Sequence, residues 1–236
     1  MTFSVAGRCA RTGMLGIAIT TSSIAVASRC PWARAGVGAV ATQNITDPRL
    51  GARGLDLMAS GLSAPEAMQR LLTDAPHPEF RQITMLDRQG RTASHSGAKT
   101  LGSNAVSEGA DCIAAGNLLS NRDVPVAMTR SFAAHPNAHL GERLLLALEA
   151  GLVSGGEMGP VKSAGLLVVH EQNWPLVDLR VDWDEGNPIS TLHRLWERFQ
   201  PQMNDYVTRA LEPSKAPAFG VPGDPAAPGA AAAGRP

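Results

Sequence analysis

The second residue, Thr2, is the side chain with the clearest potential for chemistry. Methionine aminopeptidases remove an initiator methionine when the next side chain is small, so loss of Met1 would place a free α-amine beside the Thr2 hydroxyl. An α-amine has a pKa of about 7.7–8.0, so part of it is neutral near pH 7 and can accept the hydroxyl proton. Thr2 could then act as nucleophile and base together. Many proteins begin Met-Thr without such chemistry, but here a strand pattern starts at once and would hold Thr2 rigidly in a sheet.

Three further polar residues at predicted strand positions are candidates for the same site. Ser4 shares a strand face with Thr2, so it is the alternative nucleophile or else a substrate-binding residue of the same cleft. Asn117 follows a glycine at a strand end, where its amide could donate to the oxyanion of a tetrahedral intermediate or bond its own backbone in a turn. His95 could assist proton transfer or be a hydrogen-bonded structural histidine. The predicted catalytic residues are therefore Thr2, Asn117 and His95.

Substrate-binding residues are predicted mainly at other strand ends; besides Ser4 they are Ser22, Arg34, Gln43, Asn44 and Lys162. The Arg34 guanidinium could hold a substrate carboxylate with two hydrogen bonds, or stack on the neighbouring tryptophan and pair with a structural carboxylate. Lys162 allows the same two interpretations. The other three end strands near Thr2 in the expected fold, and polar strand ends are suited to binding substrate. His135 and His139 lie in a Pro- and Asn-containing loop rather than on a predicted helix, so neither a metal nor another cofactor is predicted.

The elements that must position these side chains alternate between strands and pairs of helices. Strands are predicted at 3–8, 14–21, 37–43, 82–86, 92–96, 111–118, 164–169 and 176–181, with an irregular connection at 22–34. Helices are predicted at 47–61, 63–72, 124–134, 140–150 and 189–211. Two stacked sheets covered on each side by helices fit this order. The sequence therefore predicts an α+β fold, a four-layer αββα sandwich of two mostly antiparallel sheets.

The composition of the 236 residues favours one domain at 1–211, followed by a Pro-, Gly- and Ala-rich tail at 212–236 that is predicted to be disordered. Lys plus Arg and Asp plus Glu each number 21, so nothing favours nucleic acid or an anionic membrane as partner. No apolar run approaches the roughly 20 residues that span a bilayer, and the chain begins with no signal-peptide pattern. Three cysteines without a Cys-x-x-Cys spacing favour reduced thiols and a cytoplasmic location. The partners expected are a small-molecule substrate and further copies of the chain in a homo-oligomer.

A set of segments is similar to those of one known family. They are Thr-Phe-Ser-Val at 2–5, Pro-Trp-Ala-Arg-Ala-Gly-Val-Gly-Ala-Val-Ala-Thr-Gln at 31–43, Asp-Pro at 47–48, Arg-Gly-Leu-Asp-Leu at 53–57, Ser-His-Ser-Gly at 94–97, Gly-Asn-Leu-Leu-Ser at 116–120 and Asp-Leu-Arg-Val-Asp at 178–182. These segments resemble the domain-of-unknown-function family numbered 1028, over about residues 2–200. That family is placed by fold with the N-terminal-nucleophile hydrolases. The resemblance therefore implies an αββα sandwich with a nucleophile at the start of the first strand.

Two segments depart from the family pattern, and both could alter the pocket. The Leu-Leu after Asn117 stands where the family usually has a Met-rich version. The Trp-Asp-Glu at 183–185 stands where it often has an acidic residue and a histidine. The resemblance therefore leaves the substrate open.

Three functions are compatible with these residues. The first is a cofactor-independent hydrolase of a small amide, lactam, imide or related acyl bond, in which Thr2 forms an ester that water resolves. The second is a non-catalytic small-molecule binding or assembly module, because a fold alone does not assign a function. The third is a transferase that passes the acyl group to an amine. Loss of turnover on replacing Thr2 by Ala would separate the first from the second, and added amines would separate the third.

Overall fold

The computed structural model describes residues 1–219 and divides after Trp196 into two units. The first unit, residues 1–196, contains every predicted site residue. The second contains a 3-10 turn at Gln200–Gln202, helix α6 at Met203–Leu211 and a 3-10 turn at Pro213–Lys215. Of the tail that the sequence predicts to be disordered, residues 220–236 lie outside the described part of the chain.

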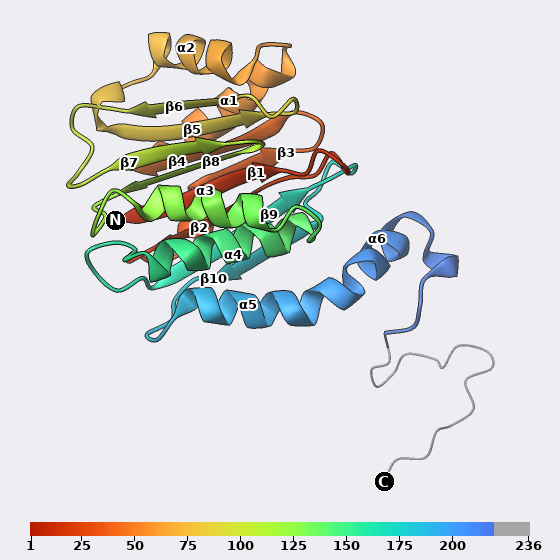
Figure 1. Ribbon diagram of the computed structural model, residues 1–236. Helices are drawn as coiled ribbons and strands as arrows, with labels where there is room; N and C mark the ends of the chain where they lie inside the picture. Colours follow the sequence, from red (N-terminus) through yellow and green to blue (C-terminus); the bar gives the residue numbers. More distant parts are fainter. Residues whose placement is uncertain (220–236) are drawn as a thin grey trace. The chain divides into compact units, whose positions relative to one another are not determined.

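The first strand, β1, lies inside a six-stranded antiparallel sheet with the order β10-β9-β2-β1-β8-β7 (Figure 1). The strands are β1 (Thr2–Arg8), β2 (Leu15–Thr21), β7 (Ala105–Gly109), β8 (Cys112–Asn117), β9 (Ser163–Val169) and β10 (Val177–Val181). The neighbours of β1 are β2, with which it forms a hairpin, and β8, which is distant in the sequence. Thr2 is paired with Asn117 of β8, and Phe3 with Thr20 of β2. The beginning of the chain is therefore enclosed by strands on both sides.

A second antiparallel sheet has four strands in the order β3-β4-β5-β6. They are β3 (Pro31–Arg34), β4 (Gly38–Asn44), β5 (Arg81–Asp87) and β6 (Thr92–Ser96). Contacts of β1 and β2 with β4, and of β8 with β5, bring the two sheets face to face. Short 3-10 turns at Val26–Ser28 and Pro78–Phe80 precede β3 and β5.

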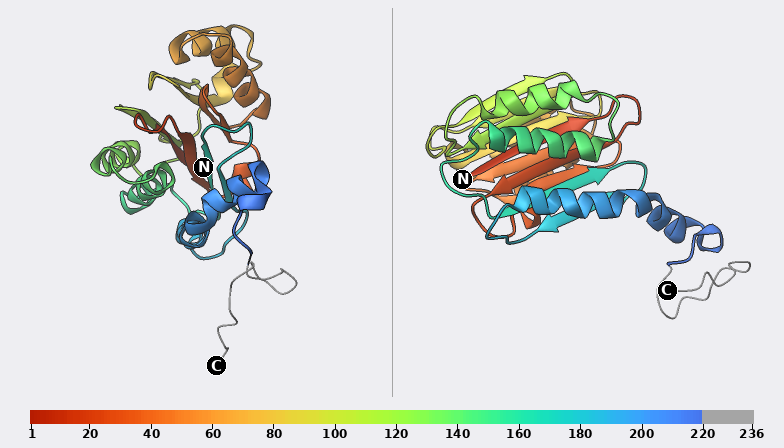
Figure 2. Two further views of the ribbon diagram at one scale, coloured as in Figure 1. Left: turned by 90° about the vertical axis from the view of Figure 1, so that its right-hand side faces the viewer. Right: turned by 60° about the horizontal axis from the view of Figure 1, so that its bottom comes forward.

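Helices cover the outer face of each sheet, as the two views of Figure 2 show. Helices α1 (Pro48–Ala59) and α2 (Ala64–Asp74) lie on the four-stranded sheet. Helices α3 (Val124–Ala134) and α4 (Leu140–Val153) lie on the six-stranded sheet. Helix α5 (Pro188–Phe199) follows β10 and buries Ile189, Leu192 and Trp196. The four-layer αββα sandwich that the sequence predicts is confirmed.

Strand alternation decides which side chains of β1 face the interior between the sheets. Phe3 points to the helical side, where a Cβ on Gly151 of α4 would lie 3.2 Å from its ring. Ser4 and Ala6 point the other way, towards the four-stranded sheet. The core between the sheets is built mostly from small and aliphatic side chains: Ala6, Leu15, Ile17, Ile19, Ala39, Ala41, Leu86 and Ile113. Thr2 shares the face of Ser4, so its side chain lies at the edge of this inter-sheet layer.

Three elements differ from the sequence prediction. Strand β3 lies within the segment predicted to be irregular, where Pro31 is tolerated because it is the first residue of an edge strand. Strand β7 was not predicted, because its residues are half-buried or exposed and lack clear alternation. The single helix predicted at 189–211 is wrong: α5 and α6 are separated by a 3-10 turn around Pro201, which has no N–H to continue an α-helix.

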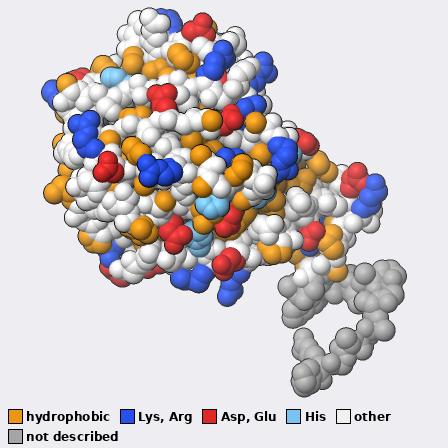
Figure 3. Space-filling view, viewed as in Figure 1, with side chains coloured by type: hydrophobic (Ala, Val, Ile, Leu, Met, Phe, Trp, Pro, Cys, Tyr) orange, Lys and Arg blue, Asp and Glu red, His pale blue; other side chains and the backbone are white. Residues whose placement is uncertain are grey.

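Charged side chains of both signs are interspersed on the face shown in Figure 3, in keeping with the equal numbers of acidic and basic residues. Within the described part of the chain, no helix combines the length and the apolar character needed to cross a membrane.

Candidate active site

Thr2 lies at the first position of β1 and is only 6% exposed. The hairpin places Thr21 beside it, with 3.2 Å between the two Oγ1 atoms. Both hydroxyls also donate to the carbonyl oxygen of Met1. The Thr21 hydroxyl therefore donates to a carbonyl oxygen in front of Thr2, as a group that stabilises an oxyanion in acyl transfer does. The sequence analysis did not single out Thr21.

A buried chain of amide side chains joins the two sheets next to Thr2. Ser4 Oγ donates to Gln43 Oε1 at 2.9 Å, and Gln43 Nε2 donates to Gln82 Oε1 at 2.8 Å. Asn117 Nδ2 donates to the same Gln82 oxygen at 3.0 Å. Gln82 Nε2 in turn donates to the Gly116 carbonyl at 3.0 Å. This neutral network fixes the residues that surround Thr2, and it includes the predicted site residues Ser4, Gln43 and Asn117.

The place of Ser4 in this network bears on the choice of nucleophile. Its hydroxyl is almost completely buried and donates its hydrogen to the Gln43 amide oxygen. An amide oxygen is a poor base, so this contact does not activate a nucleophile. Ser4 instead positions β1 against β4.

Asn117 ends β8 directly opposite Thr2. One hydrogen of its Nδ2 is used by Gln82, and an amide NH2 carries two, so one donor is left for an oxyanion. Its Oδ1 atom is buried and has no hydrogen-bond partner among the residues described. A sharp turn follows at Leu118, which has a φ of 50°. Asn117 is thus a polar side chain with unused hydrogen-bonding capacity at the predicted nucleophile.

Glu157, which the sequence analysis missed, completes the surroundings of the first residues. Residues 156–158 extend the sheet beyond the end of β8: Leu119 forms a bridge with Glu157, and Met158 N donates to Leu118 O at 2.9 Å. Ser120 N donates to Gly156 O at 3.1 Å on the same ladder. The Glu157 side chain is only 5% exposed. The extended ladder thus places a buried carboxyl group close to the amino end of β1.

The environment of Glu157 favours its neutral form. Burial raises the pKa of this carboxyl to about 7, although the amino group of Met1 and the hydroxyl and N–H of Ser22 act to lower it. The Ser22 groups are near but do not form hydrogen bonds of regular geometry, so both carboxyl oxygens lack a partner within residues 1–219. A buried carboxyl without partners is costly, and such groups are concentrated at functional sites. Ser22, a predicted site residue, therefore lies beside a group that the sequence did not reveal.

Two of the predicted site residues lie away from Thr2. Arg34 is at the end of the β3–β4 hairpin remote from Gln43, roughly 17 Å along the strand, and pairs with Asp56 of α1 at 2.8 Å. His95 faces the helical side of β6, where its Nε2 lies 2.8 Å from the Pro78 carbonyl oxygen. The roles predicted for Arg34 and His95 at the Thr2 site are corrected by these positions. Strand alternation and strand direction, which the residue types do not reveal, decide both.

Two others lie nearby but are engaged in structural contacts. Asn44 adopts a φ of 71°, donates to Phe80 O at 2.6 Å and accepts from Leu101 N at 3.2 Å. Lys162 donates its backbone N–H to Thr21 O at 2.7 Å, but its ammonium group binds the carboxylate and carbonyl oxygens of Glu185 at 2.8 Å. Asn44 fixes a loop, and Lys162 holds the strand that ends in Thr21. Neither side chain reaches into the Thr2 site through a described contact.

Fold and site together define an α+β four-layer sandwich whose candidate active site is built around the first residue of an inner strand. The chain belongs to the family of unknown function DUF1028, which matches residues 2–192. No curated protein matches this sequence.

Solved structures resemble this chain to different degrees. The crystal structure of a DUF1028 protein from Silicibacter pomeroyi has a TM-score of 0.78 and 28% sequence identity, covering 84% of this chain and 89% of that chain. Anbu (ancestral beta-subunit) from Yersinia bercovieri has a TM-score of 0.38 and 9% identity, covering 86% of this chain and 97% of that chain. An Anbu (Gly-1) mutant from Hyphomicrobium sp. strain MC1 has a TM-score of 0.38 and 12% identity, with coverages of 88% and 99%.

Proposed function

We propose that the protein is a cofactor-independent hydrolase of a small amide, lactam, imide or related acyl bond, with Thr2 as nucleophile after removal of Met1. The observation that carries this proposal is the position of the Thr2 hydroxyl, held by two neighbouring strands and 3.2 Å from the Thr21 hydroxyl. Asn117 and Glu157 supply further polar groups within the same surroundings. Few side chains are placed so rigidly at a chain terminus.

The proposed reaction proceeds through an ester on Thr2. The hydroxyl oxygen bonds to the substrate carbonyl carbon while the neutral α-amine of Thr2 takes the hydroxyl proton. Negative charge on the carbonyl oxygen is stabilised by donation from the Thr21 hydroxyl and the free hydrogen of Asn117 Nδ2. The C–N bond then breaks, and the leaving nitrogen takes the proton from the α-ammonium. Water, deprotonated by the same amine, attacks the ester and releases the acid, and the proton returns to the Thr2 oxygen.

The proposal is tested by the intact mass of the protein before and after treatment with a β-lactone. We expect a mass lacking Met1 and one adduct that peptide mapping assigns to Thr2. Thr2→Ala also has a small second residue and so loses Met1 in the same way, but it should form no adduct. Ser4→Ala should still be labelled at Thr2. Labelling that persists in Thr2→Ala would contradict the mechanism.

A non-catalytic binding module is the second candidate, and one observation favours it. With Met1 attached, Thr2 is nearly covered and has little surface for a substrate to reach. While Met1 remains attached, Thr2 has an amide nitrogen in place of the basic amine, so it cannot activate its own hydroxyl. Retention of Met1 in the purified protein would therefore support the binding module over the hydrolase.

A further inference from the structure

Met1 lies directly in front of Thr2, and its carbonyl, amino group and side chain each interact with different residues. Its carbonyl oxygen accepts hydrogen bonds from Thr2 and Thr21, and its amino group acts on the pKa of Glu157. Its side chain lies over Gly159, where a Cβ would come within 3.2 Å of the Met1 methyl carbon. Met1 is thus an α-aminoacyl group whose carbonyl, ammonium and side chain interact with different residues of the site.

The carboxyl group of Glu157, on which the Met1 amino group acts, has no other partner among the described residues. Both oxygens of Glu157 are buried without a hydrogen-bond partner in the described chain. The amino group of Met1 acts to lower the pKa of this carboxyl without forming a direct ion pair with it, and the Lys162 ammonium binds Glu185. Departure of Met1 removes this positive charge and leaves the buried carboxyl of Glu157 without it. A ligand that carries an ammonium group on its α-carbon, as an α-amino acid does, restores the lost interaction with Glu157.

The Met1 side chain lies against Gly159 and is partly open to solvent, because Met1 is 38% exposed. Gly159 offers an open backbone surface beneath the Met1 side chain. These features suit an uncharged, unbranched side chain of the length of methionine.

We propose that the acyl part of the substrate is an α-aminoacyl group with an apolar side chain, and that Glu157 binds its free ammonium group. The inference rests on the proposed function, since it names the substrate class of the Thr2 site. The carbonyl carbon of this group bonds to Thr2 Oγ1, the amide C–N bond breaks, and water releases the α-amino acid from the ester. Glu157 could instead bind the α-amine of Thr2 itself. The experiment distinguishes binding of the substrate ammonium from binding of the Thr2 amine.

The experiment uses the protein without Met1, confirmed by intact mass, and measures protection of Thr2 against β-lactone labelling. The ligands are L-methioninamide and N-acetyl-L-methioninamide, which differ in the ammonium charge. In the wild type we expect half-maximal protection at a concentration at least tenfold lower for the free amine. In Glu157→Gln this difference should fall to about twofold, with protection by the acetylated ligand unchanged. Glu171→Gln, an exposed carboxylate at the other end of β9, is the matched control and should keep the wild-type difference.

Equal protection by the two amides in the wild type would overturn the inference, as would a full difference retained in Glu157→Gln. Equal protection would mean that Glu157 serves the Thr2 amine alone. If Glu157→Gln does not fold, Glu157→Asp keeps the charge on a shorter side chain and should reduce the difference without removing it. If no lactone adduct forms on Thr2, the proposed function fails by itself. Calorimetric binding of the same two amides then decides the ammonium site, with the same outcomes.

Discussion

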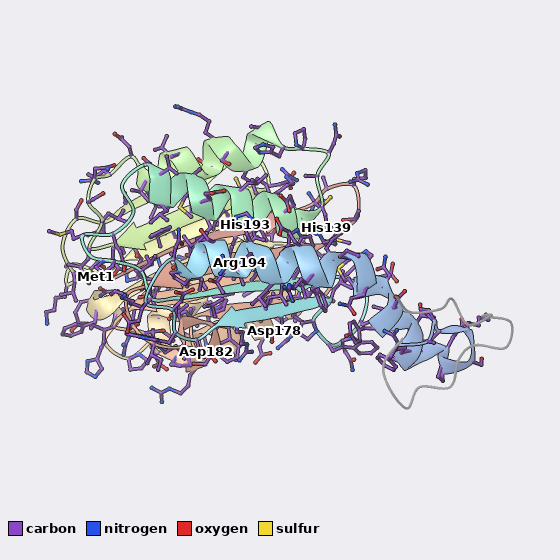
Figure 4. The ribbon with its side chains drawn as sticks, turned by 90° about the horizontal axis from the view of Figure 1, so that it is seen from below. Met1, His139, Asp178, Asp182, His193 and Arg194 are labelled. Carbon is purple, nitrogen blue, oxygen red and sulfur yellow. The ribbon has the colours of Figure 1, made fainter. Side chains whose placement is uncertain are left out.

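The two ends of the six-stranded sheet differ in how their buried polar groups are satisfied. Where β1 begins, Asn117 Oδ1 and both oxygens of Glu157 have no partner among the described residues. Where β1 ends, Arg8 pairs with Asp111 at 2.5 Å. That end also buries an unpartnered atom, Nε2 of His139, but its ring stacks on a tryptophan and burial lowers its pKa, so it stays neutral. Figure 4 shows Met1 and His139 at opposite ends.

A hollow of about 470 Å³ lies at the end where β1 ends, lined by Arg34, Val169, Glu171 and Trp174 among others. The Thr2 end is covered by Met1, which is 38% exposed. This hollow and the unsatisfied buried polar groups thus lie at different ends of the six-stranded sheet. Unpartnered groups are the stronger indication, because keeping them buried costs free energy and such groups are concentrated at functional sites.

The largest effect is expected when the buried amide network of the Thr2 end is broken. Gln82→Leu keeps the side-chain size but removes the acceptor of Gln43 and Asn117 and the donor to Gly116 O. Several buried groups then lose their partners, so the free energy of unfolding should fall by about 3 kcal/mol. Denaturant unfolding measures this. Gln69→Leu, on the exposed side of α2, is the control and should change stability by no more than about 0.5 kcal/mol. Equal effects would show that the network contributes no more than a surface amide.

The next effect, of about 3 kcal/mol at most, is expected from the charge of Glu157. Its pKa is raised from 4.5 to about 7, so between these values the folded chain holds a proton that the unfolded chain has released. The free energy of unfolding should therefore fall as pH rises through this window, by up to about 3 kcal/mol in total and by less if water enters the site. Glu157→Gln should lack this decrease. The measurement is denaturant unfolding of both proteins between pH 4.5 and 7.5, in the same state of Met1 processing. Parallel curves would show that Glu157 is not the group responsible.

The smallest effect is expected at the hollow. Arg34 and Asp56 form an exposed ion pair, so Arg34→Ala should lower the free energy of unfolding by less than about 1 kcal/mol. The rate of Thr2 labelling by a β-lactone should stay within about twofold of wild type, because the guanidinium lies at the other end of the strands. A tenfold loss of labelling would reverse the comparison between the two ends.

The fold was largely readable from the sequence because its strands and helices carry strong local patterns. The turn after Arg8 also sets the hairpin register: Phe3 pairs with Thr20, so Thr2 comes beside Thr21. This register could have identified Thr21 in advance. Strand β7 and the break at Pro201 were missed because a short half-exposed strand has little periodicity, and the amphipathic pattern continues across the proline.

The site was only partly readable, for reasons of distance in the chain. Gln43 and Asn117 were found because both end apolar strands. Arg34 also ends a strand, but this strand runs in the opposite direction to β4, so Arg34 lies at the other end of the sheet from Gln43. The residue types alone do not reveal the direction of a strand. Glu157 lies in a glycine-rich loop without periodicity, and its position depends on pairing with Leu119. Long-range pairing of this kind has no local signal.

The enclosure of Thr2 between β2 and β8 sets an order of events during synthesis. A ribosome adds about 5–20 residues per second, so β8 is made on the order of ten seconds after Thr2. During that interval the Met1–Thr2 bond projects from an unfinished sheet and is open to an exopeptidase. Once β8 is in place, the bond is enclosed. The time between the synthesis of Thr2 and the pairing of β8 with β1 would therefore decide what fraction of molecules carries a free threonine amine. The affinity of the exopeptidase for the folded protein would not.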